Sequence, residues 1–224
     1  MLLAAGRGER MRPLSDTRPK PLLEAGGRPL IEYPLRALAA AGVRRAVINT
    51  AWLGAQLRER LGDGREFGLE IVYSREPPAA LDTGGGIRQA LPLLGPDPFW
   101  LVNGDVYSEF DFPAWQLPAA AVAKLLLVPN PPHHPRGDFC LQGQRVTLDT
   151  GERLTYAGIA LLRPQLLARE RPGRFALAPV LRAAIARGLV RGERFDACWS
   201  DVGTPARLRE LDRHLKAARR SSRR

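Results

Sequence analysis

Short apolar runs along the chain alternate with segments in which apolar residues recur at helical spacing. Apolar runs too short for a helix predict buried strands, here at 1–5, 44–51, 69–74, 98–105, 121–130 and 155–164. Helical spacing predicts helices over 29–42, 52–64, 83–95, 175–188 and 205–220. A hairpin over 137–149, with Gly143 at its turn, and a strand followed by a turn over 192–204 complete the pattern.

This order of elements predicts an α/β fold. Strands that alternate with helices form a Rossmann-like, mostly parallel sheet covered by helices on both faces. The chain has 224 residues, which one hydrophobic core can serve, so we assign 1–224 to a single domain. The stretch 129–160 is rich in prolines, glycines and turns and predicts a small lobe within that domain, over the edge of the sheet.

Polar signatures follow three of the predicted strands. They are the opening loop from Gly6 onward, NGD at 103–105 and WSDVGT at 199–204. In open α/β sheets, ligands bind in the crevice at the carboxyl ends of the strands. The sequence therefore predicts one site built from these three segments.

Arginine dominates the charge of the chain, whose formal net charge is +11. This excess favours anionic partners, but the arginines are scattered, apart from the final RRSSRR, and form no basic helix with interleaved aromatics. Small anionic molecules fit better than nucleic acid. With no apolar run of membrane-spanning length and no signal peptide, we expect a cytoplasmic protein without a membrane partner. Its two cysteines, Cys140 and Cys198, are expected to be reduced.

The opening loop, GRGERMRPLSDTRPKP at 6–21, combines two glycines with many cations. It is no dinucleotide fingerprint, because Met11 stands at the third glycine position and Pro13 interrupts the helix; the P-loop pattern is absent too. Its backbone N–H groups can still form an anion-binding concavity. Lysine is rare in this chain, so its presence at Lys20 indicates a role for a compact point charge.

The spacing G-x-G-x-R-M-x-P followed by P-K-P resembles the signature of sugar-phosphate nucleotidyltransferases, which make NDP-sugars from an NTP and a sugar 1-phosphate. NGD, WSDVGT and LDTGGGIRQALPLL resemble further motifs of that family in the same order, so the resemblance covers the whole chain. It implies a glycosyltransferase-A-like fold. Within the family, segments such as RPLIEY, TGGGI and LVNGDV are most similar to the uridylyltransferase branch that acts on N-acetylmuramate 1-phosphate in cell-wall recycling.

The resemblance assigns roles to individual residues. It implies catalytic roles at the phosphates for Arg12 and Lys20. Nucleotide binding is implied for Ala5, Gly6, Gly8, Glu9, Arg10, Thr83, Gly84, Gly85 and Asn103. Metal ligation is implied for Asp105 and Asp201, and sugar binding is implied for Arg136, Asp138 and Gly158, all within 129–160.

The implied reaction needs no protein nucleophile. An oxygen of the sugar 1-phosphate attacks the α-phosphorus of UTP and pyrophosphate leaves, so catalysis consists of positioning and charge neutralisation. Mg²⁺, which bridges phosphate oxygens and is held by one or two carboxylates, is the expected cofactor. The adjacent pair His133 and His134 lacks the spacing of a helical zinc site and fits a surface or sugar-contacting loop.

Two alternatives stay open on the sequence. The same chemistry could serve another base or sugar, as in mannose-1-phosphate guanylyltransferases or glucose-1-phosphate thymidylyl- and uridylyltransferases. A non-catalytic nucleotide- or nucleic-acid-binding protein would use the positive charge alone, but would not need Arg12, Lys20, Asp105 and Asp201 together. The oligomeric state is open between a monomer and a weak dimer.

Overall fold

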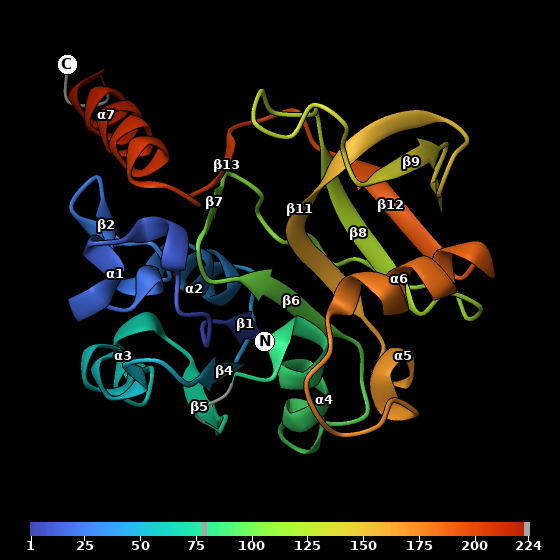
Figure 1. The fold of residues 1–224 in the computed structure, drawn as a ribbon, viewed down its shortest axis with the longest axis horizontal. Coiled ribbons are helices and arrows are strands. Elements are labelled where there is room, and N and C mark those ends of the chain that lie inside the picture. Colours follow the sequence, from blue (N-terminus) through green and yellow to red (C-terminus); the bar gives the residue numbers. More distant parts are fainter. Residues whose placement is uncertain (78–79, 222–224) are drawn as a thin grey trace.

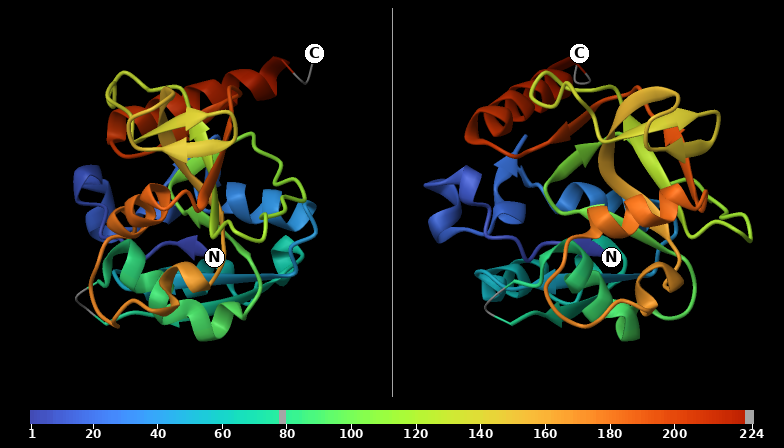
Figure 2. Two further views of the ribbon diagram at one scale, coloured as in Figure 1. Left: turned by 90° about the vertical axis from the view of Figure 1, so that its right-hand side faces the viewer. Right: turned by 45° about the vertical axis from the view of Figure 1, so that its right-hand side comes forward.

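The computed structural model describes residues 1–77 and 80–221, which form a central sheet with helices on either side (Figures 1 and 2). The strands are β1 Leu2–Leu3, β2 Glu24–Ala25, β3 Arg28–Pro29, β4 Arg45–Thr50, β5 Glu70–Arg75, β6 Phe99–Asn103, β7 Val106–Ser108, β8 Ala123–Val128, β9 Phe139–Gln142, β10 Arg145–Thr147, β11 Glu152–Leu162, β12 Val190–Arg194 and β13 Trp199–Asp201. The helices are α1 Leu14–Thr17, α2 Glu32–Ala40, α3 Gly54–Leu61, α4 Asp82–Leu94, α5 Gln165–Ala168, α6 Leu177–Ala186 and α7 Pro205–Ser221. None of these helices is both long and apolar enough to cross a membrane.

The main sheet has nine strands in the order β5-β4-β1-β6-β11-β8-β12-β10-β9. Its first four strands are parallel, but β11 runs antiparallel to β6, β8 and β9. The expected α/β fold is present, whereas the expectation of a mostly parallel sheet is wrong, because the sheet is mixed. Parallel neighbours need long crossovers, but β11 follows the β9–β10 hairpin through a short turn and can enter the sheet in reverse.

Two apolar clusters cover the two faces of the sheet, because successive strand residues point to opposite sides. Leu2, Ile48 and Val102 pack in one cluster with residues of α2 and α3. Their chain neighbours Val47 and Leu101 pack in the other with residues of α4 and α6. Helices on both faces, as expected, are therefore confirmed.

The segment 129–160 contains a loop over 129–138 followed by β9, β10 and most of β11, and these strands continue the main sheet (Figure 1). β10 pairs with β12 through Arg145 and Arg191, so the segment is joined to the sheet by backbone hydrogen bonds. The register of β11 against β8 shifts between Tyr156 and Ala160. Gly158 lies in this irregularity with a φ of 73°, a conformation that disfavours residues with a Cβ.

Candidate active site

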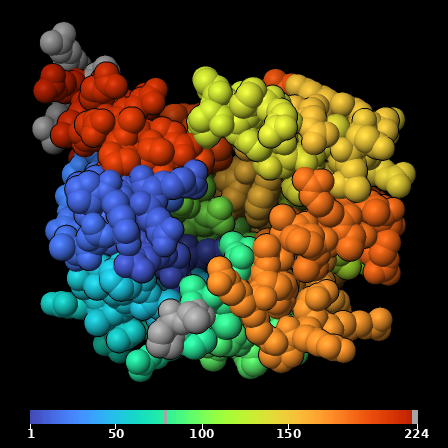
Figure 3. Space-filling model, viewed as in Figure 1, coloured from blue at the N-terminus to red at the C-terminus, as the bar shows by residue number. Residues whose placement is uncertain are grey.

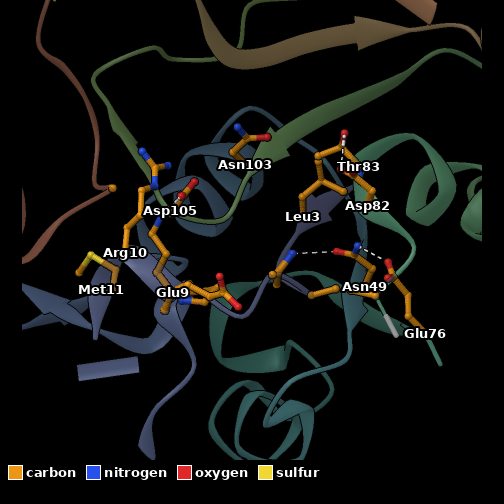
Figure 4. A pocket seen from close by; sticks show the side chains of 18 residues that line it. Leu3, Glu9, Arg10, Met11, Asn49, Glu76, Asp82, Thr83, Asn103 and Asp105 are labelled. Carbon is orange, nitrogen blue, oxygen red and sulfur yellow. Dashed lines mark hydrogen bonds and ion pairs between the residues drawn. The ribbon is translucent and has the colours of Figure 1, made fainter. Parts of the chain in front are cut away.

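A cavity of about 460 Å³ opens at the carboxyl edge of the parallel strands. The carboxyl-terminal parts of β1, β4 and β6 and the residues that follow β1 and β6 contribute to its wall (Figure 4). Figure 3 shows the molecule hollowed between the blue N-terminal segment and the orange segment that includes α6. The lining residues are Leu3, Ala4, Ala5, Gly6, Gly8, Glu9, Arg10, Met11, Lys20, Pro21, Asn49, Glu76, Ala80, Asp82, Thr83, Asn103, Asp105 and Gly203.

Much of the expected site meets around this one cavity. Nine described residues with an expected role line it, namely Ala5, Gly6, Gly8, Glu9, Arg10, Lys20, Thr83, Asn103 and Asp105. They come from the opening loop, the end of β6 and the start of α4, which lie far apart in the sequence. Their individual roles toward a ligand stay predictions.

The opening loop folds over Lys20. Gly8 adopts a φ of 67°, and a Cβ built on it would lie 3.0 Å from Cβ of Lys20. The Gly8 carbonyl accepts hydrogen bonds from the Ser15 hydroxyl at 2.8 Å and from the Met11 backbone N–H at 2.8 Å. A glycine is needed here both for the backbone conformation and for the close approach to the lysine.

Lys20 and Asp105 form an ion pair inside the cavity. The Lys20 side chain is only 11% exposed, so its ammonium depends on this carboxylate for compensation of its charge. Asp105 follows β6, and the intervening Gly104 donates its backbone N–H to the Leu3 carbonyl at 2.9 Å. The ends of β1 and β6 thus hold a lysine and an aspartate together where a ligand can reach both.

A buried Asn49–Glu76 pair, which the sequence interpretation did not place in the site, supports the cavity floor (Figure 4). Asn49 accepts from the Ala4 backbone N–H at 2.7 Å and donates to the Glu76 carboxylate at 2.6 Å. The second Glu76 oxygen accepts from the Leu81 backbone N–H at 2.9 Å. This network connects the start of the opening loop to the start of α4. Both residues lie at the carboxyl ends of parallel strands, which is the signal that could have identified them.

The glycines of the TGGGI segment lie within the first turns of α4, and two of them serve packing. A Cβ on Gly84 would lie 2.4 Å from the Phe175 ring, and one on Gly85 would lie 2.2 Å from the Gly173 carbonyl oxygen. Neither residue lines the cavity, unlike Thr83 just before them. The glycines let the 173–175 backbone approach the helix. Sequence spacing alone cannot distinguish this packing role from contact with a nucleotide.

Asp201 reaches the neighbourhood of Asp105 through a two-stranded ladder. β7 and β13 pair antiparallel with Asp201 opposite Val106, and the Val202 N–H donates to the Asp105 carbonyl at 3.0 Å. The Asp201 carboxylate, however, accepts two hydrogen bonds of 2.6 and 2.7 Å from Nη1 of Arg207 on α7. His133 Nε2 lies 3.0 Å from the same carboxylate.

The side chains of Arg207 and His133 therefore both engage the Asp201 carboxylate, and Asp201 is not among the described residues that line the cavity. Gly203, two residues on, does line it. A Cβ on Gly203 would lie 2.1 Å from Nη2 of Arg207, so the glycine makes room for that arginine. The sequence interpretation missed Arg207, whose role depends on α7 folding back toward β13.

Arg12 is the expected catalytic residue that the structure places outside the cavity lining. Its guanidinium Nε pairs with the Asp16 carboxylate at 3.1 Å, and both side chains are 48% exposed. A direct role of Arg12 at the phosphates would need this exposed pair to rearrange, and it stays a prediction.

The three residues expected at the sugar also lie outside the lining. The Asp138 carboxylate accepts from the Tyr156 backbone N–H at 2.9 Å and lies 3.0 Å from His134 Nε2, so it fastens the loop before β9 to β11. Burial, with a further contribution from the Asp138 charge, raises the pKa of the Tyr156 phenol, which therefore stays protonated.

Arg136 and Gly158 differ in how close they come to the cavity. Arg136 is exposed, and its carbonyl accepts from Nε of Arg153 at 2.7 Å. Gly158 lies against the cavity wall, since a Cβ on it would lie 2.6 Å from Nδ2 of Asn103. Gly158 thus makes space for a lining residue, while Arg136 is positioned on the outer loop.

Comparison with known proteins connects this geometry to one family. Residues 1–136 match the Nucleotidyl transferase family. The chain is 49% identical to N-acetylmuramate alpha-1-phosphate uridylyltransferase of Neisseria meningitidis over 94% of its length and 95% of the relative's. It is 36% identical to the protein of that name from Caulobacter vibrioides, over 92% and 91%.

The fold is shared with more distant structures. The inositol-1-phosphate CTP transferase of T. maritima superimposes with a TM-score of 0.75 at 21% identity, covering 96% of this chain and 94% of that one. At that identity the likeness concerns the fold alone. The family match and the two relatives carry the assignment further: this chain belongs to the nucleotidyl transferase family.

Proposed function

We propose that this chain transfers UMP from UTP to N-acetylmuramate α-1-phosphate, giving UDP-N-acetylmuramate and pyrophosphate. The observation that carries the proposal is the cavity in which the opening glycine loop, Lys20 and Asp105 meet. The names of the relatives at 49% and 36% identity supply the base and the sugar. An oxygen of the sugar 1-phosphate forms a bond to the α-phosphorus of UTP, and the bond to the leaving pyrophosphate breaks.

The chain's contribution to this displacement is positioning and charge. Backbone N–H groups of the opening loop and the cations Arg10 and Lys20 are available to the phosphate oxygens. The Lys20 ammonium, held by Asp105, is fixed before the ligand arrives and needs no reorganisation during the reaction. Asn103 and Thr83 stand at two other sides of the same cavity, where a nucleoside can be oriented (Figure 4).

The charges of the cavity lining support a requirement for a divalent cation. Arg10 and Lys20 are outnumbered by four carboxylates, those of Glu9, Glu76, Asp82 and Asp105. A triphosphate and a sugar phosphate would add further negative charge to this space. Hard carboxylate oxygens are the ligands that Mg²⁺ prefers, so the donors present fit this ion.

Asp105 and Asp201 would hold the Mg²⁺. When bound, the ion would supply positive charge that offsets the negative charge of the phosphates and of the leaving pyrophosphate. Asp105 lines the cavity and pairs with Lys20 through one carboxylate oxygen, Oδ2, so its Oδ1 is the oxygen that would bind the ion. Asp201 is engaged by Arg207, so its share in metal binding requires the arginine to release at least one carboxylate oxygen.

The decisive experiment measures pyrophosphate release over a matrix of the four NTPs and several sugar 1-phosphates, with and without Mg²⁺. We expect UTP with N-acetylmuramate α-1-phosphate to give the highest kcat/KM, and chelation of Mg²⁺ to stop turnover. A preference for GTP with mannose 1-phosphate would instead support a guanylyltransferase. Nucleotide binding without pyrophosphate release from any pair would support a non-catalytic protein.

Arg136 carries a prediction about the sugar. N-acetylmuramate differs from N-acetylglucosamine by a lactyl group with a carboxylate, which an arginine can bind by a charge-assisted hydrogen bond. Such a bond contributes about 1.5–3 kcal/mol, roughly one to two decades of discrimination. Arg136→Ala should therefore lower kcat/KM for N-acetylmuramate 1-phosphate by about that factor and leave N-acetylglucosamine 1-phosphate nearly unchanged.

The matched control is Arg145→Ala, which removes another exposed arginine from the same part of the chain and should change neither substrate. Equal losses for both sugars in Arg136→Ala would show that this arginine does not bind the lactyl group. Since Arg136 lies on the outer loop, such a result would also direct attention to cations nearer the cavity, such as Arg207.

A further inference from the structure

Three side chains with metal-binding chemistry gather outside the cavity, where α7 meets the β7–β13 ladder. They are Glu109, Cys198 and His214, and one ligand atom of each lies within 4.8 Å of the others. Glu109 follows β7, Cys198 precedes β13 and His214 is on α7. The reaction proposed above uses none of them.

We propose that Glu109, Cys198 and His214 form a binding site for Zn²⁺ or a transition-metal ion of similar preference. The donors are a thiol, an imidazole and a carboxylate, which are the three groups that bind zinc in proteins. Three protein ligands leave a fourth position for water, and the exposure of Glu109 and His214 gives solvent access to it.

The spacing of the two softer donors fits tetrahedral coordination. Cys198 Sγ lies 3.6 Å from Nε2 of His214. In a tetrahedral zinc site, bonds of about 2.3 Å to sulfur and about 2.05 Å to nitrogen place those two atoms about 3.6 Å apart. The pair is therefore already at the separation that a shared ion requires.

The backbone around the cluster fixes two of the ligands relative to each other. The Glu109 N–H donates to the Cys198 carbonyl at 3.0 Å, continuing the ladder in which Ser108 pairs with Trp199. The Glu109 carboxylate is on an exposed side chain that can close its remaining distance to the other two donors by rotation.

An apolar wall on one side separates the cluster from the interior. Cys198 packs against apolar side chains that include Tyr107, Leu208 and Leu211. The Tyr33 ring lies edge to face against the Tyr107 ring, with 5.0 Å between the ring centroids. An apolar surround of this kind limits solvent access to one side of the ion. Cys140, by contrast, is a buried residue of β9, opposite Thr147 of β10, and is not part of the cluster.

A metal at this place would connect three segments of the active-site frame. β7 begins one residue after Asp105, β13 ends at Asp201, and α7 supplies the Arg207 that holds Asp201 (Figure 1). Bound to all three, the ion would fasten the ladder that carries both candidate Mg²⁺ ligands to the closing helix. We expect saturating Zn²⁺, at about a hundredfold excess over its dissociation constant, to raise the melting temperature by about 5 °C.

The test uses the full chain, freed of metal by chelation, and titrates it with Co²⁺ as a spectroscopic substitute for Zn²⁺. We expect one ion per chain, with a near-ultraviolet thiolate-to-cobalt charge-transfer band and the visible bands of tetrahedral cobalt. Added Zn²⁺ should abolish both, whereas millimolar Mg²⁺ should not, because Mg²⁺ avoids thiolates.

Variants assign the ligands. Cys198→Ser should remove the charge-transfer band and Cys140→Ser should retain it. His214→Gln should weaken Zn²⁺ binding about tenfold or more, because losing a metal ligand costs at least as much affinity as losing a residue that is hydrogen-bonded to a ligand. Competition with a chelating dye measures this affinity. Glu210→Gln, which changes another exposed residue of α7, should bind as the unaltered chain does.

Absence of a thiolate band in the unaltered chain would overturn the proposal, and so would a band that survives Cys198→Ser. Binding that is unchanged in His214→Gln would also overturn it, and because His214 is exposed this variant tests the site even if Cys198→Ser folds poorly. A Zn²⁺ ion lost only in Asp105→Asn would place the metal in the catalytic cavity instead. None of these outcomes depends on whether the proposed reaction is correct.

Discussion

Asp105→Asn is expected to lower kcat by about a thousandfold, because it removes the cavity's proposed Mg²⁺ ligand while preserving the shape of the side chain. Asparagine keeps an oxygen that can accept from Lys20, so the fold should persist. The measurement is single-turnover and steady-state pyrophosphate release at increasing Mg²⁺, together with the melting temperature. The concentration of Mg²⁺ that gives half-maximal rate should rise as the rate falls.

Asp212→Asn is the matched control for this variant. Asp212 also pairs with a lysine, Lys216, at 2.8 Å, but on α7 and outside the cavity. Its loss should leave kcat and the Mg²⁺ requirement unchanged. Asp201→Asn should resemble Asp105→Asn if both carboxylates hold the ion, and near-normal rates in both variants would refute the metal assignment.

Lys20→Met is expected to lower kcat by about a hundredfold to a thousandfold, the range found when one preorganised charge or donor is removed from a transition state. Methionine fills much of the space of the lysine stem under the Gly8 loop, so packing should survive. Asp105 then lacks its cationic partner, which should lower the melting temperature by a few degrees at most, since its side chain is 28% exposed. The measurement compares kcat with thermal stability in the same preparation.

Lys124→Met provides the comparison for a lysine with similar surroundings. Lys124 is 16% exposed, pairs with Glu193 at 2.7 Å and lies over the Trp115 ring, away from the cavity. We expect its loss to change stability and leave kcat intact. If Lys20→Met unfolds readily while its folded fraction turns over at the normal rate, Lys20 is a structural residue.

Local patterns were sufficient to predict much of this fold from the sequence. The helices α2, α3 and α6 and the strands β4, β6 and β8 fall within the expected ranges, and β5 and α7 each extend one residue beyond theirs, because their apolar residues follow helical or strand spacing. The carboxyl-end rule also placed the opening loop and Asp105 in one cavity. These features depend on neighbours in sequence or on one general property of α/β sheets.

What could not be predicted depends on contacts between distant segments. The antiparallel pairing of β11 with β6 joins strands that are far apart in the sequence. The packing role of Gly84 appears only when Phe175 is placed against it. The hydrogen bond from Arg207 to the Asp201 carboxylate depends on how α7 is placed relative to β13. Side-chain periodicity contains no information about any of these three encounters.

The β7–β13 ladder has a consequence for how such an enzyme can diversify. Main-chain hydrogen bonds from the Val202 N–H to the Asp105 carbonyl and from the Glu109 N–H to the Cys198 carbonyl fix Asp105 and Asp201 as neighbours. The distance between these two aspartates therefore does not depend on the length of the loops in the chain that connects β7 to β13. The connecting chain contains the segment expected to contact the sugar. Insertions and substitutions there can change the specificity for the sugar 1-phosphate while the two aspartates keep their positions.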